Sequence, residues 1–141
     1  MFSTKKKQPP IRTLIGEGTV ITGELRFKEG LRIDGEVQGD VLAAEEGHSI
    51  LVISEKARVV GRVRAAHVII NGRVEGPVQS DELLELQPKA CIVGDVRYQS
   101  LEMHQGATIN GELQPLKADE KAPLIKLATS NAPSAPTAAV G

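Results

Sequence analysis

The side chains best suited to chemistry in this sequence are three histidines and one cysteine. His48, His67 and His104 lie in different parts of the chain, and none has a second histidine or a carboxylate at the spacing of a metal-binding motif. Cys91 is the single cysteine and forms no intramolecular disulfide. These residues therefore predict no catalytic residue, no metal site and no cofactor.

Two kinds of enzyme-like site can be compared with the sequence directly. A phosphate-binding loop of the form Gly-x-x-x-x-Gly-Lys-Ser/Thr is absent from the sequence, so neither nucleotide hydrolysis nor nucleotide binding is expected. Residues 15–20, I-G-E-G-T-V, match one hexapeptide of the left-handed β-helix acyltransferases. The six-residue period does not continue beyond them, so an acyltransferase is the weaker alternative and the chain is expected not to be an enzyme.

Composition narrows the class further. The chain has 141 residues, enough for one domain, and its net charge of −1 gives no reason to expect nucleic-acid binding. It has no Trp, two Phe and one Tyr, so Val, Ile and Leu must fill a narrow core. No apolar run approaches the length of a membrane span, and the N-terminus lacks the apolar segment of a signal peptide. A cytoplasmic location is the resulting expectation.

The sequence is built from two repeated units. Residues 101–113, L-E-M-H-Q-G-A-T-I-N-G-E-L, share one template with residues 84–96, 51–63 and 13–25. Residues 31–41, L-R-I-D-G-E-V-Q-G-D-V, match residues 68–78 in type. The equivalent glycines would be Gly23, Gly35, Gly61, Gly72, Gly94 and Gly111, each followed by a charged residue (Glu24, Glu36, Arg62, Arg73, Asp95 and Glu112). Such short periods are typical of repeat architectures.

The repeats predict an all-β solenoid with parallel strands. Apolar residues alternate within each unit, which is the period of a strand. A β-hairpin at Asn71-Gly72 is the local alternative, but the equivalent pairs Val60-Gly61 and Val93-Gly94 are poor tight-turn sequences. The glycines instead mark corners of about six coils, which at about 4.8 Å each form a rod roughly 30 Å long. The charged residues after them would form one outward column, either solvated or a docking stripe for a partner.

The chain divides into a repeat region, residues 13–115, and two tails. Residues 1–12 are an expected disordered tail in which Met1 and Phe2 precede Lys5, Lys6 and Lys7. Apolar side chains beside lysines can bind an anionic membrane weakly, and many copies on one assembly bind better through effective concentration. Residues 116–141 are rich in Ala, Pro, Ser and Thr and are expected to be disordered.

Neither end of the predicted solenoid has a recognisable cap, and uncapped strand edges favour stacking of one copy on another. The expected contacts are apolar residues of the first and last coils. At the N-terminal end they are Ile15, Val20, Ile21 and Leu25, and at the C-terminal end Leu101, Met103, Ile109 and Leu113.

The opening T-L-I-G-E-G-T-V-I-T-G-E-L, the L-R-I-D-G-E-V-Q-G-D-V unit and the closing A-T-I-N-G-E-L resemble the bactofilins, bacterial polymer-forming proteins, from Thr13 to about Leu116. The M-F-S-x-K-K-K start resembles their membrane-targeting N-terminus. The resemblance implies a single-stranded right-handed parallel β-helix with three short faces per coil. It also implies nucleotide-free, non-polar filaments formed by end-to-end contacts on the inner face of the cytoplasmic membrane.

By the same resemblance, the partners are further copies of the chain, membrane lipid through the N-terminal tail, and proteins of cell-wall synthesis, cell-wall remodelling or cell shape. The alternative from another functional class is a solenoid binding module that does not polymerise and uses the charged column. Filaments formed by the purified protein would favour the first reading.

Overall fold

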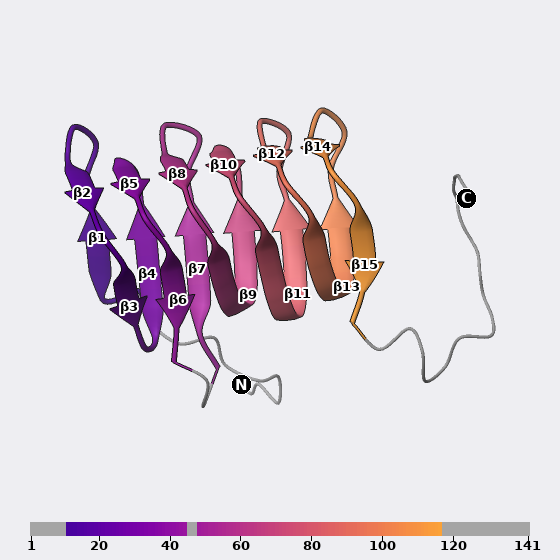
Figure 1. Ribbon diagram of the computed structural model, residues 1–141, viewed down its shortest axis with the longest axis horizontal. Coiled ribbons are helices and arrows are strands. Elements are labelled where there is room, and N and C mark those ends of the chain that lie inside the picture. The colour runs from indigo at the N-terminus through magenta and orange to yellow at the C-terminus, as the bar shows by residue number, and fades with distance from the viewer. Residues whose placement is uncertain (1–10, 45–47, 117–141) are drawn as a thin grey trace, which may run out of the picture.

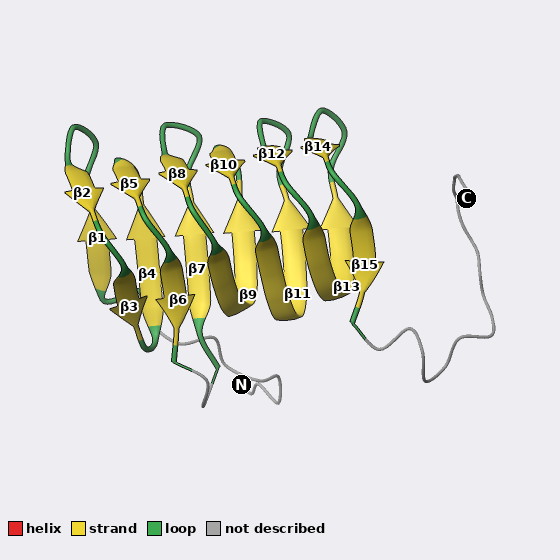
Figure 2. Ribbon diagram, viewed as in Figure 1, coloured by secondary structure: helices red, strands yellow, loops and turns green. Residues whose placement is uncertain are grey.

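The computed structural model describes residues 11–44 and 48–116, and this part of the chain contains strands but no helix (Figures 1 and 2). All paired strands are parallel, and they form a nine-stranded and a six-stranded sheet. The smaller sheet takes one strand from each turn of the chain, so the solenoid has six coils. The predicted all-β parallel solenoid is confirmed, while its right-handed sense stays a prediction.

The strands follow one another around the coils in a fixed order. They are β1 (Thr13–Ile15), β2 (Val20–Thr22), β3 (Leu25–Phe27), β4 (Gly30–Ile33), β5 (Glu36–Gln38), β6 (Val41–Ala43), β7 (Ile50–Ile53), β8 (Arg58–Val60), β9 (Val63–Ile70), β10 (Arg73–Glu75), β11 (Val78–Leu86), β12 (Cys91–Val93), β13 (Val96–Met103), β14 (Thr108–Asn110) and β15 (Leu113–Pro115).

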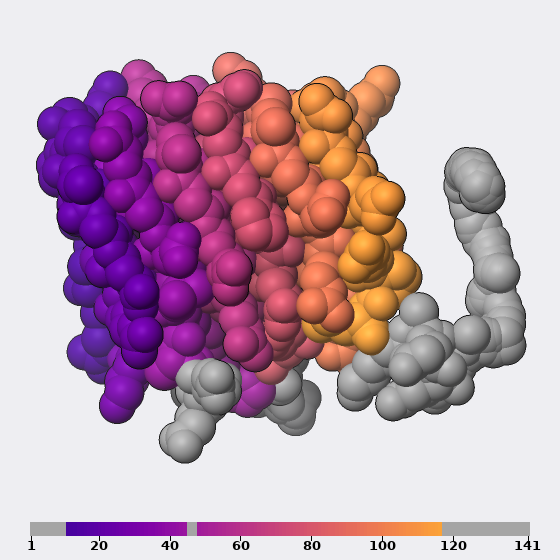
Figure 3. Space-filling view, viewed as in Figure 1, coloured from indigo at the N-terminus to yellow at the C-terminus, as the bar shows by residue number. Residues whose placement is uncertain are grey.

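Each coil has three faces. The first face contains β1, β4, β7 and the C-terminal parts of β9, β11 and β13. The second face contains β2, β5, β8, β10, β12 and β14. The third face contains β3, β6, β15 and the N-terminal parts of the same three long strands. Each long strand therefore carries the chain from the third face of one coil to the first face of the next, and the coils stack in chain order (Figure 3).

The core consists of columns in which one inward side chain per coil stacks on the next. On the second face the column contains Ile21, Val37, Val59, Val74, Ile92 and Ile109. Its four internal members are 0% exposed. Short aliphatic side chains suit this arrangement because every coil must fill the same narrow cross-section, which explains the scarcity of aromatic residues.

Two kinds of corner connect the first face to the second. Coils 1, 3, 5 and 6 use four-residue turns closed by a backbone hydrogen bond, such as that from the Ala57 N–H to the Ser54 carbonyl (3.0 Å). Coils 2 and 4 turn with two residues, Asp34-Gly35 and Asn71-Gly72. The difference explains why two repeated units exist in the sequence.

The equivalence assigned to the glycines was wrong at two positions. Gly35 and Gly72 lie at the corner between the first and second faces, whereas the column between the second and third faces contains Gly23, Gly39, Gly61, Gly76, Gly94 and Gly111. A side chain at Gly61 would place its Cβ 2.2 Å from the Gly39 carbonyl oxygen, so this column requires glycine.

The charged residues after the predicted glycines do not form one column. Glu36 and Arg73 begin strands of the second face, where they align with Arg58 between them. The others, Glu24, Arg62, Asp95 and Glu112, follow the corner glycines, where Asp40 and Pro77 complete the set. The expected single docking stripe is therefore split between two parts of the surface.

Candidate polymerisation interface

Both ends of the solenoid expose strand edges that pair on one side only within residues 11–44 and 48–116. At the N-terminal end these are β1, β2 and β3, and at the C-terminal end they are β14, β15 and the final part of β13. Free edges of parallel strands present unpaired N–H and C=O groups that another strand can bind. No other segment of the described chain covers either end.

At the N-terminal end, three of the four predicted contact residues continue the core columns. Ile15 is 6% exposed, while Ile21 and Leu25 are partly buried against the core. Val20 is different, because it aligns with Glu36 in an outward column and is 57% exposed. Its side chain therefore points away from the core, although it remains at the rim of the first coil.

At the C-terminal end, all four predicted residues continue inward columns. Leu101 and Ile109 are partly buried against the core, whereas Met103 and Leu113 are 46% and 43% exposed. Leu113 aligns with Val96, its fully buried equivalent one coil earlier. The side chain at this position of the coil is thus fully buried inside the solenoid and partly exposed at its end.

Leu14, which the repeat pattern did not indicate, is 59% exposed on the outer side of β1. It aligns with Arg32, so it lies on the outer surface rather than in a core column. Together with Val20, it makes the rim of the first coil more apolar than the equivalent positions of the second coil, Arg32 and Glu36. Strand alternation could have predicted that Leu14 and Val20 face outward, because each lies next to an inward residue.

Charged side chains away from the ends are mostly ion-paired, either within one coil or between neighbouring coils. Arg73 Nε lies 2.7 Å and an Arg58 Nη 3.2 Å from a Glu75 oxygen, and these hydrogen bonds, Arg73 first, lower the pKa of Glu75. A side-chain hydrogen bond with Ser54 lowers the pKa of Asp34 in the same way. Exposed pairs of this kind contribute little to stability, but they balance the charges of side chains on the outer surface of the coils.

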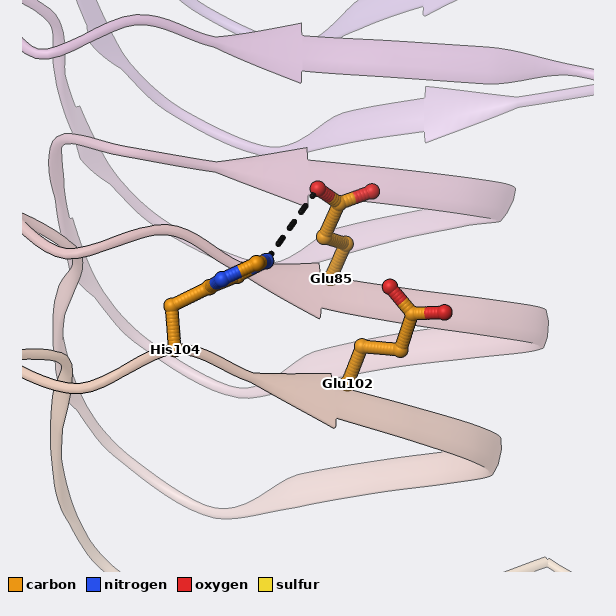
Figure 4. A group of neighbouring side chains, drawn as sticks. All are labelled: Glu85, Glu102 and His104. Atoms are coloured by element: carbon orange, nitrogen blue, oxygen red, sulfur yellow. Dashed lines mark ion pairs between the residues drawn. The ribbon is translucent and has the colours of Figure 1, made fainter.

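One group of potential metal ligands forms on the last two coils. Glu85 on β11 aligns with Glu102 on β13, and His104 Nε2 lies 3.6 Å from a Glu85 oxygen (Figure 4). One donor atom of each lies within 4.8 Å of the other two. Sequence spacing missed this group because Glu85 is one coil away from His104. Glu102 and His104 are exposed, and only three donors converge, so the geometry supports no more than weak cation binding.

The part of the chain that the structure describes has no helix capable of spanning a membrane. Met1, Phe2, Lys5, Lys6 and Lys7, the predicted membrane-binding residues, lie outside that part. Their role therefore stays a prediction.

Two proteins of Myxococcus xanthus are similar to this chain in sequence. Bactofilin BacO of Myxococcus xanthus is 30% identical over 101 residues, covering 72% of this chain and 77% of BacO. Bactofilin BacP of the same organism is 27% identical over 101 residues, covering 72% of this chain and 40% of BacP.

Two solved structures match as well. The Thermus thermophilus bactofilin in a cryo-EM reconstruction of double helical filaments has a TM-score of 0.65 and 32% identity, covering 74% of this chain and 98% of that chain. The crystal structure of a mutant bactofilin from the same organism has a TM-score of 0.59 and 34% identity, covering 65% and 98%.

The family model described as "Bactofilin: Polymer-forming cytoskeletal" matches residues 13–114, which is nearly the whole solenoid from β1 to β15. The chain, whose described residues form six stacked coils, therefore belongs to the bactofilin family of polymer-forming cytoskeletal proteins.

Proposed function

We propose that this chain forms non-polar filaments without nucleotide by end-to-end stacking of its solenoids. The single observation that supports this most is the opening of the core columns at both ends, at Leu25 and Leu113 for example. A second copy would cover these side chains, and burying an aliphatic side chain fully is worth about 1.5–3 kcal/mol. The double helical filaments of the Thermus thermophilus bactofilin support assembly of this kind.

Negative-stain electron microscopy of the purified protein without nucleotide tests the proposal. Filaments are expected. Particles that stay monomeric or dimeric across the accessible concentration range would favour the alternative, a binding module that does not polymerise.

Polymerisation is expected to be independent of nucleotide. The sequence has no phosphate-binding loop, and the predicted contacts at both ends are aliphatic. Light scattering should therefore give the same assembly curve with ATP, with GTP and with neither. A requirement for either nucleotide would contradict this part of the proposal.

The filaments are further proposed to lie on the inner face of the cytoplasmic membrane through the N-terminal tail. Met1 and Phe2 supply apolar insertion, and Lys5, Lys6 and Lys7 attract anionic lipid. One tail binds weakly, whereas a filament presents a row of tails and gains affinity through effective concentration. On the membrane, the filaments would localise proteins of cell-wall synthesis, cell-wall remodelling or cell shape.

Removal of residues 1–9 is expected to abolish co-sedimentation of filaments with anionic liposomes. Phe2→Ser should release filaments at any salt concentration, whereas replacing Lys5, Lys6 and Lys7 by Ser should weaken binding to anionic liposomes only. High salt should mimic the lysine change, since the Debye length falls to about 3 Å at 1 M. Pelleting without lipid is the control, and undiminished lipid-dependent pelleting of the shortened chain would contradict the role of the tail.

A further inference from the structure

The third face carries a groove near the N-terminal end whose lining is basic and apolar. Its volume is about 600 Å³, and its lining residues are Arg26, Phe27, Lys28, Leu42, Ala43, Ala44, Arg62 and Arg64. Four of these eight residues are cationic, and none is a carboxylate. They come from three successive coils, so the groove exists only because β3, β6 and β9 lie side by side (Figure 1).

The strand register explains why this face collects positive charge. Arg26 aligns with Leu42, and Leu42 aligns with Arg64. Further along the solenoid, the same outward column continues through Gln79, Arg97 and Gln114. The column therefore contains three arginines and no acidic residue, whereas the outward column of the first face contains Glu85 and Glu102.

Two of the four cations in the groove lack an ion-pair partner among the described residues. Arg26 pairs with Glu24, and an Arg64 Nη lies 3.4 Å from an Asp81 oxygen. Lys28 and Arg62 are exposed and form no such pair within residues 11–44 and 48–116.

The Asp40 carboxylate accepts a hydrogen bond from the Arg62 backbone N–H (3.0 Å), not from its guanidinium. Among the described residues, carboxylates therefore pair with Arg26 and Arg64 but not with the side chains of Lys28 and Arg62.

The groove lies beside the point where the N-terminal tail joins the solenoid. The Arg12 N–H donates to the Gly30 carbonyl (3.2 Å), and the Arg12 side chain pairs with Glu29, the neighbour of Lys28. A smaller hollow of about 330 Å³ is lined by Arg12 and also by Arg26, Phe27 and Lys28 of the groove. End-to-end stacking alone would leave the outer side of the solenoid uncovered.

We propose that this groove binds the phosphate headgroups of anionic membrane lipids and that the third face is the membrane-facing side of the filament. The inference rests on the membrane-binding part of the proposed function and adds a second, folded contact to it. Cations beside apolar side chains, here Phe27 and Leu42, match a phosphate headgroup joined to its apolar chains. Each subunit would then contribute one groove as well as one tail to the attachment.

The test uses the full chain and vesicles of phosphatidylglycerol and phosphatidylcholine, compared with vesicles of phosphatidylcholine alone. Lys28→Glu with Arg62→Glu is expected to weaken binding to the anionic vesicles at least about tenfold. Lys56→Glu with Lys89→Glu is the matched control. It changes the net charge equally, but its lysines lie in turns between the first and second faces, opposite the third face. The control should bind nearly as well as the unmodified chain.

Sedimentation without lipid separates this inference from the proposed function. Both double variants should form filaments, because neither pair of residues belongs to a core column at the ends. Equal binding by both variants would overturn the groove, even if removal of the tail abolishes attachment. Fluorescent polyglutamate provides a second comparison. If the Lys28 and Arg62 variant loses binding to polyglutamate but binds vesicles as before, the lipid proposal is overturned and the groove instead binds an acidic protein segment.

Discussion

Replacing Leu113 by Arg is expected to abolish filaments and to leave the folded solenoid intact. Leu113 extends the column that contains Val96 and is 43% exposed at the open end of the last coil. In the free protein a longer cationic side chain at this position can reach water. In a stacked filament the charge would be buried without a partner, at a cost of several kcal/mol. The protein concentration needed for assembly should therefore rise about 100-fold or more.

Ultracentrifugation measures this effect directly, and Gln114→Arg is the matched control. Gln114 is the next residue of β15, but it aligns with Arg97 in the outward column, so an arginine there stays in water in either state. The control should pellet as the unmodified chain does. The signal of Tyr98, the one tyrosine, and far-ultraviolet circular dichroism report the fold. A folded Leu113→Arg variant that pellets normally would show that this end makes no filament contact.

The size of the species left by Leu113→Arg also tests whether the filament is non-polar. When like ends meet, blocking the C-terminal end leaves the contact between two N-terminal ends, and dimers should remain. When unlike ends meet, one blocked end removes every contact, and monomers should remain. Leu25→Arg, which blocks the other end, should give the same result in each case. Sedimentation velocity distinguishes the two arrangements.

Local patterns in the sequence predicted the solenoid because every coil buries apolar side chains at equivalent positions. Ile109 and Leu113 flank a glycine as Val59 and Val63 do, and alternation alone places all four side chains inward. Seven of the eight residues expected to form the end contacts lie in core columns, and their role in polymerisation stays a prediction. The eighth, Val20, belongs to an outward column because it precedes the inward Ile21 on β2.

The corners could not be predicted as well, since glycine occurs at two kinds of corner. Asp34-Gly35 and Asn71-Gly72 are compact connections between the first and second faces, and their glycines look the same in sequence as Gly39 and Gly76 of the other column. Only the register between coils separates them. The same limit applies to groups assembled across coils, which include Glu85 with His104 and the four cations of the third-face groove.

Replacing Gly61 by Ala is expected to prevent stable folding. Gly61 belongs to the glycine column between the second and third faces. Gly61 has a φ of +153°, which L residues with a side chain rarely adopt. A Cβ there would lie 2.2 Å from the carbonyl oxygen and 2.5 Å from the carbonyl carbon of Gly39. Both atoms belong to the backbone of the coil below, so no side chain can move aside to relieve the contact.

Coils 2 and 3 would have to separate at this corner. The hydrogen bonds beside it, from the Gly39 N–H to the Val60 carbonyl (2.9 Å) and from the Val41 N–H to the Arg62 carbonyl (2.8 Å), would weaken. Backbone strain and lost packing together should lower the free energy of unfolding by more than about 3 kcal/mol. Because Gly61 lies in the middle of the solenoid, the change weakens the stacking contacts that stabilise the coils on both sides.

Gly16→Ala is the matched control, because a Cβ at Gly16 meets no heavy atom within 4 Å and its φ is not in the left-handed region. This change should alter the free energy of unfolding by no more than about 0.5 kcal/mol. Urea unfolding followed by circular dichroism compares the stability of the two variants. Both chains also carry Leu113→Arg and are measured at one protein concentration, because assembly itself stabilises the folded state. If Gly61→Ala unfolds at the same urea concentration as Gly16→Ala, the corner column does not require glycine, and the close stacking of Gly61 on Gly39 is not what fixes the spacing of the coils.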